Sequence, residues 1–276
     1  MMTPRFAAAQ AAGSRPVHVG EYLREWRQRR RLSQLDLAGE AEISARHLSF
    51  VETGRAAPSR DMVLRLAERL DVPLRERNVL LVAAGFAPLF PNRTLDDPAL
   101  AAARQAMEIV LKAHEPCPAL AIDRHWNLVS ANAMVAPLLD GVAPALLQPP
   151  LNVLRLAFHP DGLAPRTANL AEWCAHLLER LHRQIEATAD PALVALRDEL
   201  KTYPVPARRT PAANPVDSVA VPFQMTFGKG VLSFISTTMV FGTPVDVTLS
   251  ELALETFFPA DEGTAAAMRE MAGAGD

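Results

Sequence analysis

The stretch LSQLDLAGEAEISARHLSFVETG, residues 32–54, decides the fold of the first part of the chain. Ser33 precedes a short amphipathic run and is a good N-cap, because its hydroxyl accepts an otherwise unpaired backbone amide. Ser44 has the same place before a second run that ends at Gly54, which suits the left-handed conformation that closes helices. The stretch therefore predicts helices over 34–39 and 45–53, joined by a turn.

Two helices at this spacing are typical of a helix-turn-helix, whose second helix enters the DNA major groove. Leu48 and Val51 share the inward face of that second helix. The side chains left facing outward are those of Ala45, Arg46, Ser49 and Phe50. In the first helix, Leu35 and Ala38 are predicted to point inward and Leu37 to lie at the edge.

The flanking sequence completes an all-α domain of five helices. Upstream, Leu23 and Trp26 recur at helical spacing, and downstream two more helices are predicted over 60–71 and 74–84. The buried stripe of the fourth helix is Met62, Val63, Leu66, Ala67 and Leu70. Glycine and proline then end the pattern, so we place a domain boundary near residue 92.

This domain resembles the Cro/repressor (Xre) family of helix-turn-helix proteins, over roughly residues 18–88. The residues that carry the likeness are Leu32-Ser33-Gln34, Leu37-Ala38, Ile43-Ser44, Leu48-Ser49, Glu52, Gly54-Arg55 and Pro58-Ser59. Many independent positions agree, and this agreement makes the likeness specific.

The resemblance implies roles for individual residues. Gln34, at the N-terminal end of its helix, is expected to bind a DNA phosphate. The residues expected to face the bases are Ala45, Arg46, Ser49 and Phe50. Ser44 and Arg55, beside the two ends of this helix, complete the predicted DNA-contacting set, and a structural ion pair is expected between Arg27 and Glu52.

The charges divide the chain in the same region. Residues 1–90 carry 14 basic and 10 acidic side chains, whereas residues 91–276 carry 14 basic and 21 acidic side chains. A basic domain can neutralise DNA phosphates, and an acidic domain is repelled by the duplex. We therefore predict a flexible tail over 1–17, a DNA-binding domain over 18–92, and a ligand-binding and dimerisation domain over 93–276.

The apolar runs and the cysteines of the sequence predict where the protein is located and in which state its thiols are. No apolar run reaches the ~18 residues of a membrane span, and residues 1–19 lack the apolar core of a secretion signal. We expect a cytoplasmic protein without a membrane partner. Cys117 and Cys174 lie outside any CxxC motif or histidine pair, so no metal is expected, and the thiols are either free and buried or joined in a disulfide.

The second half alternates between helical and period-two patterns. Helices are predicted over 98–114, 133–139, 151–158, 170–188 and 191–203, before a Pro-rich loop over 204–215. A hairpin is predicted over 118–132, followed by β-rich segments over 219–227, 230–241 and 246–258, with a tight turn at 228–230. An opening hairpin, a helical middle and a closing antiparallel set predict a five-stranded α+β arrangement in the order of PAS domains.

This half resembles the ligand-binding domain of the MmyB-like transcription regulators, over about residues 95–268. The segments that carry the likeness are AIDRHWN (121–127) with Asn132, Asn152 with Arg155 and Phe158, LSF (232–234), FGTP (241–244) with DVT (246–248), and residues 251–261. The resemblance implies a PAS-like sensor joined to an Xre-type reader, with a small apolar effector such as a fatty-acid-like molecule.

Candidate ligand-binding residues come from the apolar pattern and from the resemblance. The candidates for the wall of a cavity are Trp126, Phe158, Trp173, Met225 and Phe234, and Asn132 joins the ligand-binding set. Arg155 and His159 lie four residues apart on a predicted helix and together can hold a carboxylate head group. The alternative is that Arg155 pairs with a structural acid such as Asp123 or Asp246, and that the apolar candidates form an ordinary core.

Functions other than regulation find less support in the sequence. The histidines of the second half are scattered, and no serine or cysteine lies in a nucleophile elbow or beside a matching acid, which disfavours catalysis. No cofactor is expected apart from the effector. A second domain that only holds dimers together is the main alternative to a sensor. In either case we predict a homodimer that binds a double-stranded DNA operator.

Overall fold

The structure is a computed structural model that describes residues 18–206, 221–228 and 230–273. It divides into two compact units. The first contains the described residues up to Arg93 together with the segments Arg183–Pro191 and Val245–Val247, and the second contains the remainder. The predicted tail, most of the Pro-rich loop, the start of the first β-rich segment and Lys229 of the tight turn lie outside the described residues.

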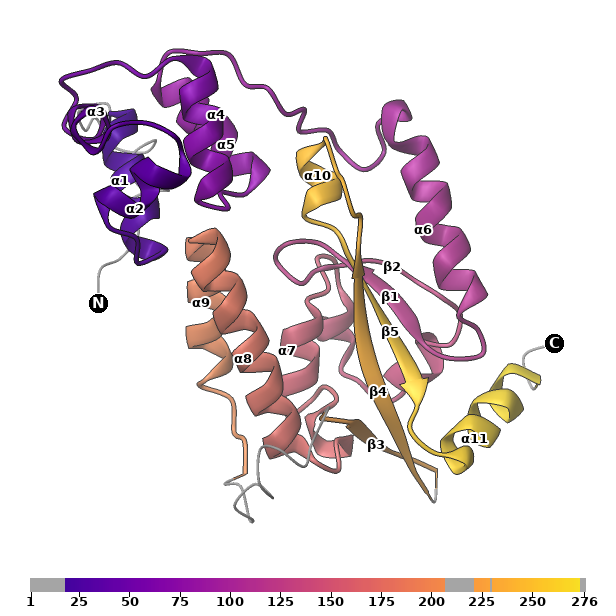
Figure 1. The fold of residues 1–276 in the computed structure, drawn as a ribbon. Coiled ribbons are helices and arrows are strands. Elements are labelled where there is room, and N and C mark those ends of the chain that lie inside the picture. The colour runs from indigo at the N-terminus through magenta and orange to yellow at the C-terminus, as the bar shows by residue number, and fades with distance from the viewer. Residues whose placement is uncertain (1–17, 207–220, 229, 274–276) are drawn as a thin grey trace. The chain divides into compact units, whose positions relative to one another are not determined.

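In the described part of the first unit, five helices precede Arg93, as Figure 1 shows. They are α1 (Val19–Arg29), α2 (Gln34–Glu40), α3 (Ala45–Glu52), α4 (Arg60–Arg69) and α5 (Leu74–Ala83). The hydroxyl oxygens of Ser33 and Ser44 accept hydrogen bonds from the backbone amides of Asp36 and His47, both at 3.1 Å. These caps satisfy amides that have no partner inside the helix, and they confirm the predicted helix starts.

The core of these helices confirms most of the predicted inward positions and corrects one. Leu48 and Val51 are fully buried, as predicted. The prediction for α2 was wrong, because Leu35 is 72% exposed and Leu37 is completely buried. Leu37 and Ala38 share the inward side of the helix, and a residue two positions before Leu37 is turned about 200° away from it.

Two glycines are required around α3, one after its C-terminal end and one where α1 contacts it. Gly54 has φ +73°, the predicted left-handed conformation, and it follows directly after the C-cap of the helix. A Cβ atom at Gly20 would lie 2.1 Å from the carbonyl oxygen of Val51 and 2.8 Å from the Cα of Glu52. Only a residue without a side chain therefore allows α1 to pack this closely against α3.

The rest of the described chain combines helices with one sheet. Its elements are η1 (Pro98–Leu100), α6 (Ala101–Ala113), β1 (Ala119–Ile122), β2 (Leu128–Ala131), η2 (Ala136–Leu139), η3 (Pro144–Leu147), α7 (Val153–Phe158), η4 (Ala164–Arg166), α8 (Leu170–Thr188), α9 (Pro191–Leu200), β3 (Phe223–Phe227), β4 (Gly230–Val240), α10 (Val247–Ser250), β5 (Ala253–Pro259) and α11 (Glu262–Gly273).

The sheet has five strands in the order β2-β1-β5-β4-β3, and every neighbouring pair is antiparallel. This confirms the predicted five-stranded α+β arrangement. Three details differ from the prediction. The segment over 246–258 begins with the helical turn α10, the segment over 133–139 contains only a short 3-10 turn, and the helix α11 was not predicted.

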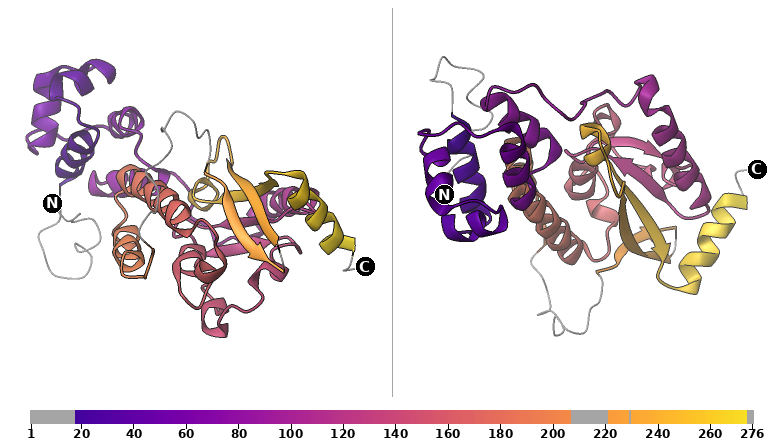
Figure 2. Two further views of the ribbon diagram at one scale, coloured as in Figure 1. Left: turned by 90° about the horizontal axis from the view of Figure 1, so that it is seen from below. Right: turned by 45° about the horizontal axis from the view of Figure 1, so that its top comes forward.

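Different helices cover the two faces of this sheet. On one face, Met107 and Leu111 of α6 pack with Ala121 and Leu254, and α11 lies on the same side (Figures 1 and 2). The opposite face looks toward α7 and α8 (Figure 1). Side chains alternate between the faces along each strand, so Leu120 and Glu255 point away from α6.

Candidate DNA-recognition helix and ligand cavity

The outer face of α3 carries the residues predicted to read DNA. Arg46 is exposed, and Ala45, Ser49 and Phe50 are half-buried at the edge of the core. The guanidinium carbon of Arg46 lies 5.4 Å from the centre of the Phe50 ring, a distance typical of a cation–π contact. Within its own unit the helix therefore presents a cationic and aromatic surface one turn long.

A buried ion pair holds α3 in place. Arg27 on α1 donates from Nε to Oε1 of Glu52 at 2.7 Å and from Nη2 to Oε2 at 3.0 Å. The two side chains are 10% and 0% exposed, and the hydrogen bond to Glu52 raises the pKa of Arg27. The predicted ion pair is confirmed. Since Arg27 also donates to the carbonyl of Leu32 at 2.8 Å, one guanidinium ties α3 to α1 and to the chain that enters α2.

Gln34 belongs to the same network. Its Nε2 donates to Oε2 of Glu52 at 2.7 Å, so one of its two amide protons is committed inside the domain. The second N–H of that group can donate a hydrogen bond to another acceptor, such as a phosphate oxygen. The position of Gln34 is consequently fixed by Glu52, and this arrangement orients the amide before any DNA arrives.

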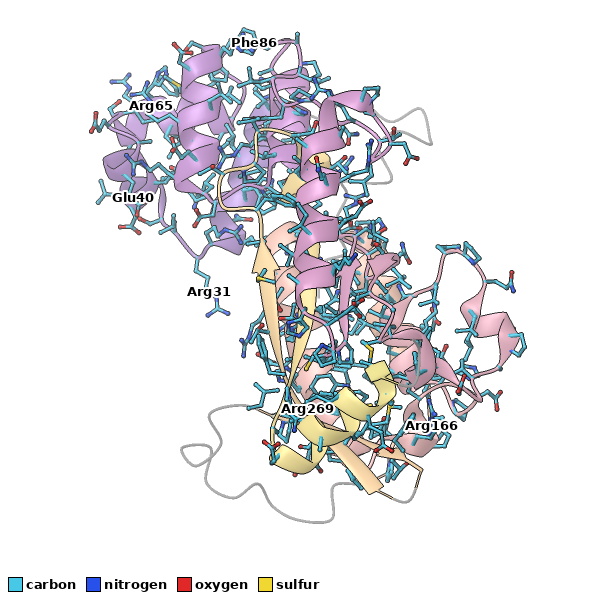
Figure 3. The ribbon with its side chains drawn as sticks, turned by 90° about the vertical axis from the view of Figure 1, so that its right-hand side faces the viewer. Arg31, Glu40, Arg65, Phe86, Arg166 and Arg269 are labelled. Carbon is cyan, nitrogen blue, oxygen red and sulfur yellow. The ribbon has the colours of Figure 1, made fainter. Side chains whose placement is uncertain are left out.

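Basic residues around these helices differ in their roles. Arg30 donates to the carbonyls of Leu70 at 2.8 Å and Asp71 at 2.9 Å, so it caps the end of α4. Arg31 is exposed, and its side chain extends away from the helices (Figure 3). Arg55, just beyond α3, is also exposed. Arg31 and Arg55 thus face solvent, whereas Arg30 is structural.

The second unit contains a cavity of about 110 Å³, which is lined by side chains of the sheet and of the helices α7 and α8. Trp126, Trp173, Met225 and Phe234, four of the predicted wall residues, line it. Aromatic contacts connect part of this wall, since the ring centres of Trp173 and Phe223 are 5.1 Å apart. The wall is otherwise formed almost entirely by aliphatic side chains.

One polar cluster borders the cavity. Arg180 on α8 donates from Nη1 to Oε2 of Glu255 at 3.1 Å, and its Nη2 donates to the other oxygen of Glu255 and to Thr238 Oγ1. Thr238 Oγ1 also donates to Glu255 at 2.9 Å. The guanidinium lies 5.0 Å from the centre of the Trp126 ring. Arg180 and Glu255 are the two charged residues among the described side chains that line the cavity.

The backbone of Trp126 is in a strained conformation. Its φ is +67°, which is rare for a bulky residue and costs about 1–3 kcal/mol, so it persists only where neighbouring groups hold it. The amide of Trp126 donates to the carbonyl of Asp123 at 3.0 Å, and its own carbonyl accepts from the amide of Val153 at 2.9 Å. Asn152 adds a bond from Nδ2 to the carbonyl of His125 at 2.7 Å. The loop and the start of α7 thus hold the indole against the cavity.

The structure places the other predicted ligand-binding residues away from the wall. Phe158 is fully buried, but it does not line the cavity. Asn132 is structural, because Oδ1 accepts from the amide of Ala119 at 3.1 Å and Nδ2 donates to the carbonyls of Leu111 and Cys117. We therefore remove both residues from the candidate site.

Arg155 and His159 do not form a carboxylate-binding pair at the cavity. Arg155 binds Glu199 through Nε at 2.7 Å and Nη2 at 2.8 Å, and this bond raises the pKa of Arg155 and lowers that of Glu199. His159 Nδ1 accepts from the amide of Asp161 at 3.0 Å. The structural alternative for Arg155 is the one that the geometry supports, although its acid is Glu199 and neither of those proposed.

The two cysteines are free thiols. Cys174 is buried on α8, and burial raises its pKa to about 12, while burial also raises the pKa of Cys117. Neither thiol is therefore activated as a nucleophile. Among the residues that the structure describes, no group of histidine, cysteine and acidic side chains is arranged to hold a metal ion.

Arg180 and Glu255 were missed by the sequence reasoning. Arg180 lies seven residues after Trp173, a spacing that keeps both on one face of a helix, and this signal was available. Glu255 lies two residues before Phe257 on β5, so both side chains point to the same face of the sheet. From sequence alone, an acidic residue at such a position is normally expected to face solvent. Its burial depends on a partner 75 residues away.

The helix-turn-helix and the cavity define a class of protein, namely a DNA-binding transcription regulator with a ligand-binding domain. Comparison with protein families supports this assignment: a helix-turn-helix domain model matches residues 18–80, and the MmyB-like transcription regulator ligand binding domain matches residues 103–271. The second match covers more than half of the chain. The chain therefore belongs to the MmyB-like transcription regulator family. Both predicted resemblances are confirmed.

The families are regulatory, DNA-binding and ligand-binding domains, rather than enzymes. No individual curated protein matches the chain. In the ranges that the structure describes, no helix has both the length and the apolar character needed to cross a membrane.

Proposed function

We infer that the chain binds its operator as a homodimer through the outer face of α3, and that a small apolar molecule in the cavity controls this binding. The cavity carries the proposal, because a wall that is apolar apart from one ion pair is the usual form of a small-molecule site. Arg46 is the candidate base reader, since arginine makes the commonest specific contact with guanine. Gln34 and Arg55 are proposed phosphate contacts.

The DNA-binding part is tested by Arg46→Ala and Gln34→Ala in an electrophoretic shift assay. Arg46→Ala is expected to weaken binding to the native operator by about 1–3 kcal/mol with little effect on unrelated DNA. Gln34→Ala should weaken binding to all sequences alike, because a phosphate contact carries no sequence information. Equal affinity of wild type and Arg46→Ala for the operator would overturn the assignment of Arg46.

The dimer has a separate, geometric test. Two recognition helices related by a twofold axis require half-sites about 34–36 Å apart, or a multiple of that distance. Footprinting of the operator should therefore protect two regions at one of these spacings. Protection of a single half-site at saturating protein would contradict the dimeric arrangement.

The size of the cavity limits the proposed effector. An engineered cavity of about 150 Å³ lined by aliphatic and aromatic side chains binds benzene. A cavity of about 110 Å³ therefore suits a ring or chain of similar size. A short acyl chain, as in a fatty-acid-like molecule, belongs to this class.

Ala157→Leu tests the ligand-binding part, because Ala157 lies on the cavity wall and the added carbons would fill the space. The wild type should gain about 2.7 kcal/mol of stability when a fitting ligand is present at a hundredfold excess over its Kd, and Ala157→Leu should lose that gain. Ala102→Leu, at an exposed position on α6, is the matched control, and this variant should keep the gain in stability that the ligand provides.

If no small apolar compound stabilises the protein and the protein is still dimeric, the alternative function, dimerisation without ligand sensing, is favoured. The C-terminal domain would then serve dimerisation alone. Ligand-dependent change in operator affinity, lost in Ala157→Leu and kept in Ala102→Leu, would support control by the effector.

A further inference from the structure

The charge balance at the edge of the cavity indicates which ligands it accepts. Arg180 and Glu255 are 22% and 6% exposed, and they neutralise each other through two parallel hydrogen bonds. Thr238 bonds to both partners. The cluster therefore presents polar atoms to the cavity but no net charge.

A carboxylate in this cavity would lack a cation. Both oxygens of Glu255 already hold Arg180, so a ligand carboxylate bound to a remaining N–H would add a buried negative charge that no cation compensates. It could take the charge of the guanidinium for itself only by displacing Glu255. The displaced side chain would remain buried without its partner, which is strongly unfavourable. Arg155, the other candidate cation, is bound to Glu199 and does not line the cavity.

A neutral oxygen meets no such penalty. A guanidinium has five N–H donors, and three donor–acceptor contacts of Arg180 are made to Glu255 and Thr238. A carbonyl or hydroxyl oxygen can accept one of the remaining donors without breaking the ion pair. Its apolar remainder can lie against Trp126 and Trp173.

We propose that the cavity selects uncharged ligands, apolar molecules with one carbonyl or hydroxyl group, and that Glu255 excludes free carboxylates by neutralising Arg180. This inference rests on the proposed ligand-binding function and narrows its chemical class. Glu255 is consequently a specificity-determining residue, and a fatty acid is accepted only as an uncharged derivative.

Hexanamide and hexanoate form a suitable pair of probes, because they have the same shape and the same alkyl chain and differ in charge at neutral pH. Their binding to the full-length protein is measured by calorimetry at pH 7.5. Hexanamide should bind at least about 100-fold more tightly, since uncoupling a buried ion pair costs two to three powers of ten in an equilibrium constant. Affinities within threefold of each other would overturn the proposal.

The variant Glu255→Gln should change the preference. It leaves Arg180 without its counter-ion, so the affinity for hexanoate should rise at least about tenfold while that for hexanamide changes little. Glu199→Gln is the matched control, because it frees Arg155 outside the cavity wall, and it should leave the ratio of the two affinities as in the wild type. A Glu255→Gln protein that folds and still rejects hexanoate would overturn the role of Glu255.

Failure of this inference differs from failure of the proposed function. If neither probe binds the wild type, the proposed ligand site is itself overturned. If both bind equally and Ala157→Leu abolishes both, the site stands and the selection for uncharged ligands is wrong. If Glu255→Gln does not fold, the ratio of the hexanamide and hexanoate affinities of the wild type still tests whether the cavity selects uncharged ligands.

Discussion

Substitution of Gly20 by alanine tests how α3 is held. The new methyl group would meet the carbonyl oxygen of Val51 at 2.1 Å, whereas ordinary contacts of a Cβ begin at 3.4 Å. The obstructing atoms belong to the backbone of α3 and cannot rotate away. The helices α1 and α3 must therefore separate by about 1 Å, which also strains the bonds between Arg27 and Glu52.

The magnitude follows from two opposing terms. Overpacking of this kind costs about 1–3 kcal/mol and sometimes more, and a clash with backbone belongs at the upper end. Alanine in place of glycine within a helix returns up to about 1 kcal/mol. We expect Gly20→Ala to lower the free energy of unfolding of the first unit by about 2 kcal/mol.

Gly39 provides the matched control. It lies in α2, and a Cβ atom there would have no neighbour within 4 Å. Gly39→Ala should therefore stabilise the unit by about 0.5–1 kcal/mol, so the two substitutions are expected to act in opposite directions.

Hydrogen exchange of peptides from α1, α2 and α3 in the full-length protein is the suitable assay, because two units need not unfold in one transition. Gly20→Ala should also weaken operator binding, since α3 is displaced. Protection of Gly20→Ala equal to that of Gly39→Ala would refute the argument that close packing requires a glycine at position 20.

Three further results are expected. Glu52→Gln should lower the free energy of unfolding of the first unit by about 3–5 kcal/mol, measured by hydrogen exchange, because it leaves Arg27 buried without its counter-ion. Cys174 should resist alkylation by iodoacetamide at pH 8 in the native protein, since burial raises its pKa to about 12. The bond to Arg155 lowers the pKa of Glu199. The wild type should therefore be more stable than Glu199→Gln above about pH 5, and this difference should vanish as the pH falls through the lowered pKa. Its size should be about 1 kcal/mol or below, because the pair is half-exposed.

Each of these results has a control or an outcome that would contradict it. Glu40→Gln, at an exposed position on α2, should change stability by about 0.5 kcal/mol or less, so a similar value for Glu52→Gln would contradict the role of the buried pair. Rapid labelling of Cys174 would contradict its burial. Thermal melts between about pH 7 and pH 3 measure the Glu199 effect, and a difference that grows as the pH falls would have the wrong sign.

Local signals explain the parts that were predicted well. Ser33 and Ser44 cap their helices, and Gly54 takes a left-handed conformation, because each depends on atoms within a few residues along the chain. The five-stranded α+β arrangement followed from the alternation of apolar residues in an opening hairpin and a closing set of β-rich segments. Leu35 was misplaced, since a helix as short as α2 contains too few residues to fix its inward direction.

Partners distant in the sequence explain what was missed. Arg155 meets Glu199 across 44 residues, and Arg180 meets Glu255 across 75. Nothing in the alternation of β5 distinguishes an acid that is buried with a partner from one that faces solvent. Arg155 is therefore bound to Glu199 and does not form the carboxylate site that was predicted with His159.

By itself, the sequence determined the helix-turn-helix, the class of the second domain and the apolar composition of a possible binding site, because caps, periodicity and turns are local properties. Only the tertiary structure decided that Gly20 must lack a side chain, and that Arg180 is neutralised beside the cavity. Packing distances and the pairing of charges depend on how separate elements come together, and no pattern within one segment records them.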